Sequence, residues 1–421
     1  MASMKYLKIL SLILIAVGPG WIYGQGLENY FSEAAEQNPG LKASYLEFEA
    51  ALEQVEQANS LPELNFSFGY FISPVETRVG PQRAKFSISQ MFPWFGTLKS
   101  QGDAATLLAE ARYQEFLDRR NRLYFELAQA YYPLYELDQL VRIQTANLEI
   151  LDSYKSIANR QFANGRGSMV DVLRVDLLIN ETNTQIEILE QKRKPLTAAF
   201  NNLLNKPDSA VVLLPDTLVV DMQVATSGKD SIASGSHPKV ESFRLRTNAM
   251  QQKGESAARQ AMPRFGVGID YVLIDRRGDL SAAEGAALEN NGRNALMPMV
   301  NMSIPLFNSR YSSARKEAEI MQEVYRQKEE EAINSLETGY EKVWFEMIQS
   351  QRLFVLYGDQ MAETQQVLNL LFSAYSNEGN DFEELLRVQQ RLLNYEMMRV
   401  SALVQYKVAE AELNYITAKS Y

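Results

Sequence analysis

The chain has 421 residues, a formal net charge of −10 at pH 7, one histidine and no cysteine. The negative charge argues against general nucleic-acid binding, which needs a basic surface. Without cysteine the chain has no disulfide bond and no thiolate metal site. The sequence also lacks a nucleophile–base pair and a phosphate-binding loop. We therefore expect no catalytic, cofactor or metal site, and no enzyme activity.

The first residues have the pattern of a secretory signal peptide. Lys5 and Lys8 precede or border an apolar run over residues 9–17, and small residues follow as far as Gly24. This run is too short to span a membrane. We expect residues 1–24 to be removed and the mature chain to lie outside the cytoplasm. No later segment has about twenty consecutive apolar residues.

The remaining sequence repeats itself. The segment "NPGLKASYLEFEAALEQVEQANSLPELNFSFGY" begins at Asn38, and "HPKVESFRLRTNAMQQKGESAARQAMPRFGVGIDY" begins at His237. In each, a proline follows the first residue, which predicts a helix start. We expect repeat 1 over residues 25–210 and repeat 2 over residues 237–421, joined by a linker over 211–236. The stretch from 205 to 236 reads as short strands and loop.

Each repeat contains two segments that predict β-strands. "NFSFGYF" alternates Phe66, Phe68 and Tyr70 with smaller residues, and "RAKFSISQMF" alternates around Phe86 and Ile88. The second repeat offers "MVNMSIP" and "RFGVGIDYVLI", whose large apolar residues would share one face; these are Phe265, Val267, Ile269 and Tyr271. Such alternation is typical of transmembrane strands. It also fits soluble hairpins packed on helices, and the segments alone leave both interpretations open.

A short joint changes the period of the chain from strand to helix. Its residues correspond between the repeats as Pro93 with Pro305, Phe95 with Phe307, and Gly96 with Asn308. We expect Pro93 to end the strand, Gly96 to take an unusual backbone angle and Thr97 to cap the following helix. Trp94 and Phe95 suit a bilayer–water boundary, or equally a hydrophobic seal between sheet and helices.

Long helices follow each joint. The composition predicts a helix over residues 97–161, which Pro133 should kink or divide. After turns at 163–168 and 376–381, apolar residues recur every seven positions in two phases. They include Val172 and Val175 in the first repeat, and Leu385 and Val388 in the second. Heptads sustained for this length indicate coiled-coil packing.

The order of these features resembles the TolC-like outer-membrane efflux proteins, and the resemblance covers essentially the whole mature chain. It implies a mainly α protein with a transmembrane β part and two structural repeats. Four strands are too few to close a barrel, and open edges are not tolerated in lipid. The resemblance therefore implies a homotrimer, in which each chain supplies one third of a 12-stranded outer-membrane β-barrel. The long coiled-coil helices would form an α-barrel tunnel through the periplasm.

The resemblance also implies a location and partners. Most of the chain would lie in the periplasm and the strands in outer-membrane lipid, with the loops 73–82 and 275–297 facing outward. A periplasmic adaptor protein would contact the turns between the long helices and connect the channel to an inner-membrane transporter. The turn residues are Asn164, Gly165, Gly167, Asn377 and Gly379, although plain turn chemistry also explains them.

The resemblance places a gate at the same periplasmic tip. Asp171 and Glu384 fall at the position where family members carry inward carboxylates, and such a ring would favour cations. Both also have the spacing of helix-capping residues, Ser168 with Asp171 and Asp381 with Glu384, so capping alone is the competing interpretation. Arg174 and Arg387 replace a second acid of the family and suggest arginine–carboxylate links between neighbouring helices.

We therefore expect a passive exit duct of a tripartite efflux pump that exports small toxic compounds. The same duct with protein cargo, as in type I secretion, is one alternative. A secreted coiled-coil scaffold or adaptor without channel activity is another, and its hairpins should be polar on the outward face.

Overall fold

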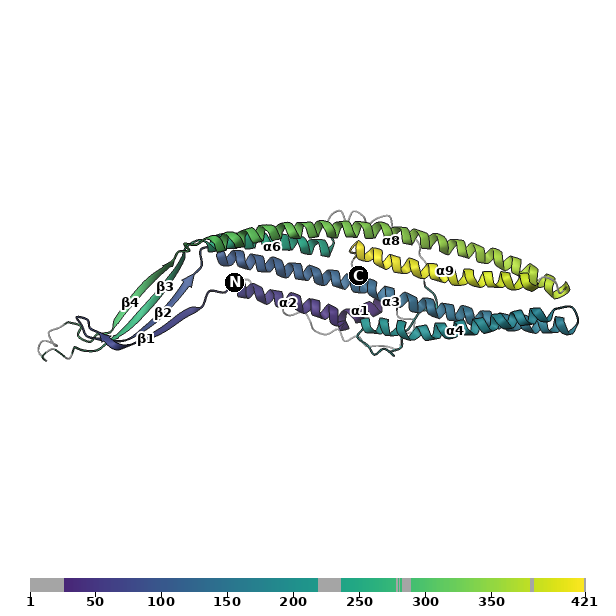
Figure 1. Cartoon of the computed structure of the whole chain (residues 1–421), viewed down its shortest axis with the longest axis horizontal. Coiled ribbons are helices and arrows are strands. Elements are labelled where there is room, and N and C mark those ends of the chain that lie inside the picture. Colours follow the sequence, from purple (N-terminus) through teal and green to yellow (C-terminus); the bar gives the residue numbers. More distant parts are fainter. Residues whose placement is uncertain are drawn as a thin grey trace, which may run out of the picture. The chain divides into compact units, whose positions relative to one another are not determined.

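The computed structural model describes residues 26–218, 236–277, 279, 281, 289–378 and 382–419 (Figure 1). The predicted signal peptide and most of the predicted linker lie outside these residues. Contacts between residues divide the described chain into two units, and the ranges below include only the described residues within them. Unit 1 contains residues 26–37, 126–218 and 348–408. Unit 2 contains residues 38–125, 236–347 and 409–419.

Helices account for most of the described chain. They are α1 (Leu27–Gln37), α2 (Pro39–Asn59), α3 (Thr97–Ala163), α4 (Met169–Leu203), α6 (Pro238–Gln260), α8 (Ser309–Glu378) and α9 (Phe382–Ile416). Pro133 does not divide α3, whose 67 residues form one helix. No helix within the described ranges carries the long apolar stretch that a bilayer span needs.

Within the described residues, one antiparallel sheet contains the two predicted hairpins. Its strands are β1 (Leu64–Val75), β2 (Gln82–Phe92), β3 (Arg264–Ile274) and β4 (Ala295–Ser303), in the order β1-β2-β3-β4. The hairpins join through the pairing of β2 with β3. β1 and β4 pair on one side only, so the sheet is open in the single chain.

Both halves of the chain present a helix, a hairpin, a very long helix and a 35-residue helix in the same order. The boundaries of the two repeats stay a prediction. One smaller expectation is wrong, because β4 starts at Ala295, inside the loop predicted over 275–297. The described residues 205–218 contain no strand, and residues 219–235 of the predicted strand-and-loop segment lie outside the described residues.

The heptad positions form the core of unit 1. Val172 and Val175 of α4 and Leu385 and Val388 of α9 are buried in one hydrophobic cluster with residues of α3 and α8. Each fully buried side chain of this size contributes roughly 1.5–3 kcal/mol. The predicted coiled-coil seam therefore stabilises the helix pairs of this unit.

The joint between β2 and α3 is in unit 2. β2 ends at Phe92, directly before Pro93, and Gly96 has a φ of +77°, as predicted. The carbonyl of Gly96 accepts the first helical hydrogen bond, from the Ser100 N–H at 3.0 Å. Gly96 therefore occupies the capping position. The prediction that Thr97 caps α3 is wrong, because Thr97 is the first helical residue and its hydroxyl has no hydrogen-bond partner among the described residues.

The only histidine of the sequence, His237, caps α6 as its position before Pro238 predicts. Its Nδ1 accepts a hydrogen bond from the Lys239 backbone N–H at 3.2 Å, so Nε2 carries the ring hydrogen and donates to the Tyr415 carbonyl at 3.2 Å. The residue is 1% exposed. In the first half, Asn38 caps α2 in the same way, with its side chain accepting from the Leu41 N–H.

Burial lowers the pKa of His237 below its ordinary value. The nearby Asp118 carboxylate on α3 opposes this shift, and Lys239 on α6 adds to it. Asp118 accepts a hydrogen bond from the Tyr415 hydroxyl of α9, and burial raises the pKa of Asp118, against the attraction of His237, Lys239 and Arg122. Neutral His237 therefore fits this site, because a proton on Nδ1 would remove the cap acceptor.

We predict that His237 makes the stability of the protein depend on pH. A lowered pKa means that the folded chain binds fewer protons than the unfolded chain, so the stabilisation is complete above about pH 6.5 and is lost as the pH falls through the folded-state pKa. The variant His237→Asn keeps a cap acceptor that does not titrate. Its unfolding temperature should fall less than that of the wild type between pH 7 and pH 5. Equal pH slopes would contradict this role.

Candidate functional site

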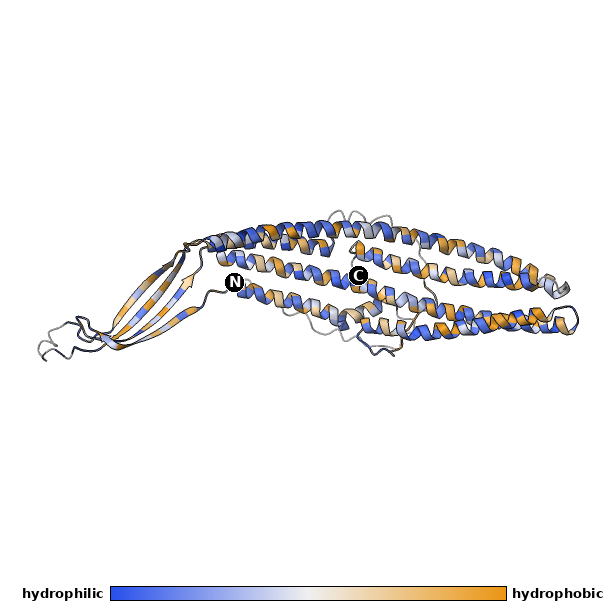
Figure 2. Cartoon of the chain, viewed as in Figure 1, coloured by the Kyte–Doolittle hydropathy of each residue, from blue (hydrophilic) through white to orange (hydrophobic). Residues whose placement is uncertain are grey.

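The four strands present one apolar face. Directly opposed residues of an antiparallel pair lie on the same face of the sheet. Between β1 and β2, the register places Phe66 opposite Ile88 and Phe68 opposite Phe86. Between β2 and β3, it places Ile88 opposite Ile269 and Phe86 opposite Tyr271. The predicted set Phe265, Val267, Ile269 and Tyr271 is 40–57% exposed. Figure 2 shows the alternation of orange and paler residues along the strands. A large aromatic and aliphatic surface is thus left uncovered in the single chain.

The opposite face of the sheet carries polar and small residues together with some aliphatic ones, such as Val272 and Met91. Its register opposes Ser67 with Ser87 and Ser87 with Asp270. The Lys85 ammonium on β2 forms an ion pair with the Asp270 carboxylate on β3, and Asp270 has no exposed surface. Sequence analysis did not identify this pair. A usable signal was present, because Lys85 and Asp270 each stand at a position that alternates with the large apolar residues of their strand. A charge pair therefore lies on the face opposite the aromatic residues.

The two joints differ in detail. Phe95 is 82% exposed in the first joint, and Phe307, beside Pro305 in the second, is 87% exposed. The Trp94 ring contacts Phe95 and Phe265, with centroids 5.9 Å apart in each case. Asn308, which corresponds to Gly96, is not among the described residues with positive φ; its carbonyl accepts the first helical bond of α8 from Ser312. Exposed rings thus accompany both strand–helix transitions.

Arg259 of α6 fixes the first joint and was missed by sequence analysis. Its Nη1 donates to the Gly96 carbonyl at 2.7 Å and to the Ser100 hydroxyl at 2.6 Å. Nothing in the sequence marks this contact, because the residues are more than 150 positions apart.

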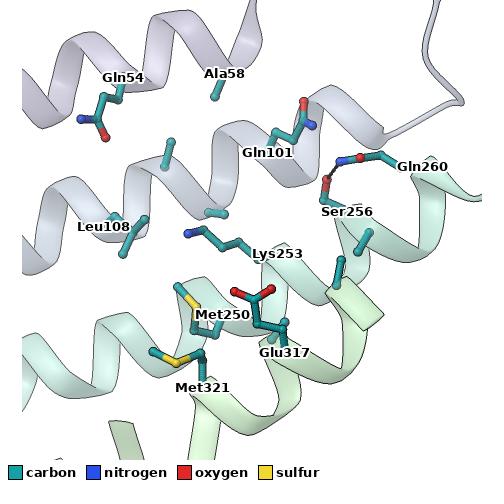
Figure 3. Close-up of a pocket in the computed structure, with 15 residues that line it drawn as sticks. Gln54, Ala58, Gln101, Leu108, Met250, Lys253, Ser256, Gln260, Glu317 and Met321 are labelled. Atoms are coloured by element: carbon teal, nitrogen blue, oxygen red, sulfur yellow. Dashed lines mark hydrogen bonds between the residues drawn. The ribbon is translucent and has the colours of Figure 1, made fainter. Parts of the chain in front are cut away.

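A cavity of about 490 Å³ lies among α2, α3, α6 and α8 of unit 2 (Figure 3). Alanines provide much of its wall. Figure 3 shows Lys253 and Glu317 within it, beside Gln101, and the hydrogen bond from Gln260 to Ser256 at 3.1 Å. The opposite charges of Lys253 and Glu317 give this lining no net charge.

Asp171 lies at the start of α4 and closes a capping box. Its carboxylate accepts a hydrogen bond from the Ser168 N–H at 3.2 Å, and the Ser168 hydroxyl accepts from the Val170 N–H at 3.1 Å. Asp171 therefore makes the capping contacts that its spacing from Ser168 predicts, and its gate role stays a prediction. For Glu384 the predicted capping partner, Asp381, lies outside the described residues.

Arg174 and Arg387 form different kinds of ion pair, one between two helices and one within a single helix. Arg174 of α4 reaches Glu383 of α9 at 2.9 Å, and lies 3.9 Å from Asp171 on its own helix. Arg387 forms an ion pair with Glu384 within α9. An arginine–carboxylate link between helices is thus present at Arg174, but its acid is Glu383, which sequence analysis did not single out.

The predicted turn residues are only partly described. Gly165 has a φ of +69°, and the N–H groups of Arg166 and Gly167 both donate to the Gln161 carbonyl, so the glycines close the helix end after Asn164. The second turn is shorter than predicted, because α8 continues to Glu378 and includes Asn377. Gly379 lies outside the described residues.

Comparison with known proteins gives a family match for part of the chain and a fold for nearly all of it. Residues 30–205 match the outer membrane efflux protein family. No curated protein matches the chain significantly. The solved outer membrane protein VceC from Vibrio cholerae is 16% identical, with a TM-score of 0.74 and coverage of 93% of this chain and 95% of VceC.

Two further channels have the same fold. The Neisseria gonorrhoeae MtrE outer membrane channel is 16% identical, with a TM-score of 0.73 and coverage of 93% of this chain and 88% of MtrE. CusC, whose structures describe transmembrane channel formation, is 16% identical, with a TM-score of 0.76 and coverage of 96% of this chain and 95% of CusC. The resemblance found in the sequence is thereby confirmed: residues 30–205 carry the pattern of the outer membrane efflux protein family, and the chain has the fold of TolC-like outer-membrane channels over nearly all of its length.

Proposed function

We propose that the protein is a trimeric outer-membrane channel that serves as the passive exit duct of a tripartite pump for small toxic compounds. The observation that carries this proposal is the four-stranded sheet, which combines an exposed apolar face with two edge strands that each pair on one side only in the described chain. Unpaired backbone groups are not tolerated in hydrocarbon, so the edges need partners. Three copies joined edge to edge would supply twelve strands.

The distribution of side chains supports a membrane barrel over a secreted scaffold. A scaffold predicts polar residues on the outward face of its hairpins, whereas Phe66, Phe68 and Ile269 are each more than half exposed. With this face toward lipid, the face that carries Lys85 and Asp270 would line the duct. The proposal contains no catalytic step, because the duct only provides a path.

The helical part would lie in the periplasm. We propose that an adaptor protein docks at the turns that contain Asn164, Gly165 and Gly167 and, in the second repeat, Asn377 and Gly379. The adaptor would connect the duct to an inner-membrane transporter that supplies the energy. The turn between α3 and α4 is compact and glycine-rich, which leaves backbone accessible to a partner.

We also propose that the helix ends beside these turns form the gate. Asp171 and Glu384 would supply negative charge to this gate. Arg174 and Arg387 would supply positive charge and form ion pairs with carboxylates. The bridge from Arg174 to Glu383 supports this proposal, because it links α4 to α9 through exposed side chains. Exposed ion pairs contribute only about 0–1 kcal/mol, so such a link can open without unfolding the helices.

The duct is tested by single-channel recording with detergent-purified protein in planar bilayers. We expect the purified protein to be a trimer and to give discrete, cation-selective conductance steps. A soluble monomer that never inserts would refute the channel and favour the scaffold.

The acidic charge at the tip is tested by Asp171→Asn, which removes the charge and keeps an oxygen for the cap. We expect lower cation selectivity, because fewer negative charges surround the constriction. The matched control is Ser168→Ala, which removes the cap hydroxyl and leaves the charge. The same selectivity change in both variants would reduce Asp171 to a capping residue.

The interhelical link is tested by Arg174→Gln. We expect the open fraction of the channel to rise by up to roughly fivefold for each bridge lost, which corresponds to the upper value of an exposed ion pair. Arg387→Gln makes the same charge change but breaks a pair within one helix, and should have a smaller effect. Equal effects would show that charge at the tip matters and that the bridge does not.

A further inference from the structure

A second cavity, of about 590 Å³, lies in unit 2 at the joint between the sheet and the helices. The ends of α2 and α6, the start of α3 and the start of α8 all contribute to its wall. It shares Ala58, Gln101 and Gln260 with the cavity of Figure 3, so the two cavities adjoin. The proposed duct makes no use of this space.

The charged residues that line this cavity are all positive. Arg264 of β3 and Arg310 of α8 line it, and no aspartate or glutamate does. Within the part of the chain that the structure describes, neither arginine forms an ion pair. Arg259, close by in the sequence, is by contrast engaged with Gly96, Ser100 and Glu255. The two cavity arginines thus keep their donors available for a ligand.

A buried donor also lacks a partner here. Thr97 lines the cavity, is 1% exposed, and its hydroxyl makes no hydrogen bond within the described chain. Leaving a buried hydroxyl unpaired costs free energy. A bound oxygen acceptor would remove this cost. Thr97 begins α3 and Ser309 begins α8, so the positive ends of two helix dipoles lie at the same cavity.

We propose that the joint cavity binds a phosphate-type oxyanion. The guanidinium groups of Arg264 and Arg310 would hold its oxygens through paired N–H donors, as arginine does with phosphate. The Thr97 hydroxyl would donate a further hydrogen bond. Trp94 and Tyr311 complete the wall with amphipathic rings. The cavity of Figure 3 does not fit this ligand, because Glu317 balances Lys253 there.

A free phosphate ester and a phospholipid headgroup share this chemistry. Arg264 lies in the same alternation as Gly266 and Asp270, on the polar face, which favours a soluble anion. Trp94 contacts Phe265 of the apolar face, which favours a headgroup whose chains lie along the aromatic surface. The lipid source rests on the proposed membrane location, whereas the oxyanion site itself does not.

The site is tested by isothermal titration of the full-length protein in neutral detergent. The probes are inorganic phosphate, and short-chain phosphatidylglycerol and phosphatidylcholine of equal chain length. The variants Arg264→Gln and Arg310→Gln should each weaken binding by roughly 10–100-fold, the range for a hydrogen bond to a charged group. The matched control is Arg315→Gln on α8, whose ion pair with Glu319 lies outside the cavity, and it should bind as the wild type does.

Each outcome decides the proposal. Arginine-dependent binding of inorganic phosphate supports the site with a soluble source, and arginine-dependent binding of phosphatidylglycerol alone supports it with a lipid source. Binding of no probe, or equal losses in Arg315→Gln, would overturn it. If the glutamine variants fail to fold, Arg264→Lys and Arg310→Lys should still bind more weakly than the wild type, because lysine lacks the planar fork. The titration measures ligand binding and does not depend on channel conductance. A negative result for the proposed duct can therefore be distinguished from a negative result for this site.

Discussion

The backbone hydrogen bonds at the two edges of the sheet are the constraint on which the rest of the molecule depends. β1 and β4 each pair on one side within the described chain, and the aromatic face beside them is uncovered. In water such a surface would promote aggregation, and in hydrocarbon each unpaired group costs several kcal/mol. Edge pairing between identical chains would satisfy the backbone groups, and lipid would cover the aromatic face. In the proposed trimer, assembly therefore follows from the unpaired edges and membrane insertion from the uncovered face.

The joint lets one chain satisfy two different periodicities. β2 alternates every two residues for a sheet, and α3 follows a helical period for packing, so the backbone must reorient within residues 93–96. Pro93 ends the strand ladder and Gly96 supplies a left-handed angle that other residues adopt with strain. Arg259 then anchors the turn from another helix. In the second joint the strand-to-helix change occurs at Asn308, which has no positive φ. The two repeats therefore make the same transition with different backbone geometry.

What the sequence predicted follows from periodicity, and what it missed follows from distance along the chain. Alternation placed Phe265 and Ile269 on one face, and the heptads placed Val175 and Leu385 in the core, because both patterns are local. The bridge from Arg174 to Glu383 joins residues more than 200 positions apart, and the choice of Glu383 over its neighbour Glu384 depends on helix rotation. The error at Thr97 has a local cause, since a one-residue shift of the cap from Thr97 to Gly96 changes its role.

The proposed gate depends on a difference in strength between two kinds of contact at the tip. Tyr375 and Phe382 pack with ring centroids 4.5 Å apart, and both are buried in the cluster that joins α8 to α9. The side chains of Arg174 and Glu383 are 42% and 73% exposed, so their bridge is worth about 0–1 kcal/mol. Three such bridges in a trimer would then oppose opening by roughly 3 kcal/mol at most. A docking partner can supply that difference while the apolar core keeps each hairpin intact.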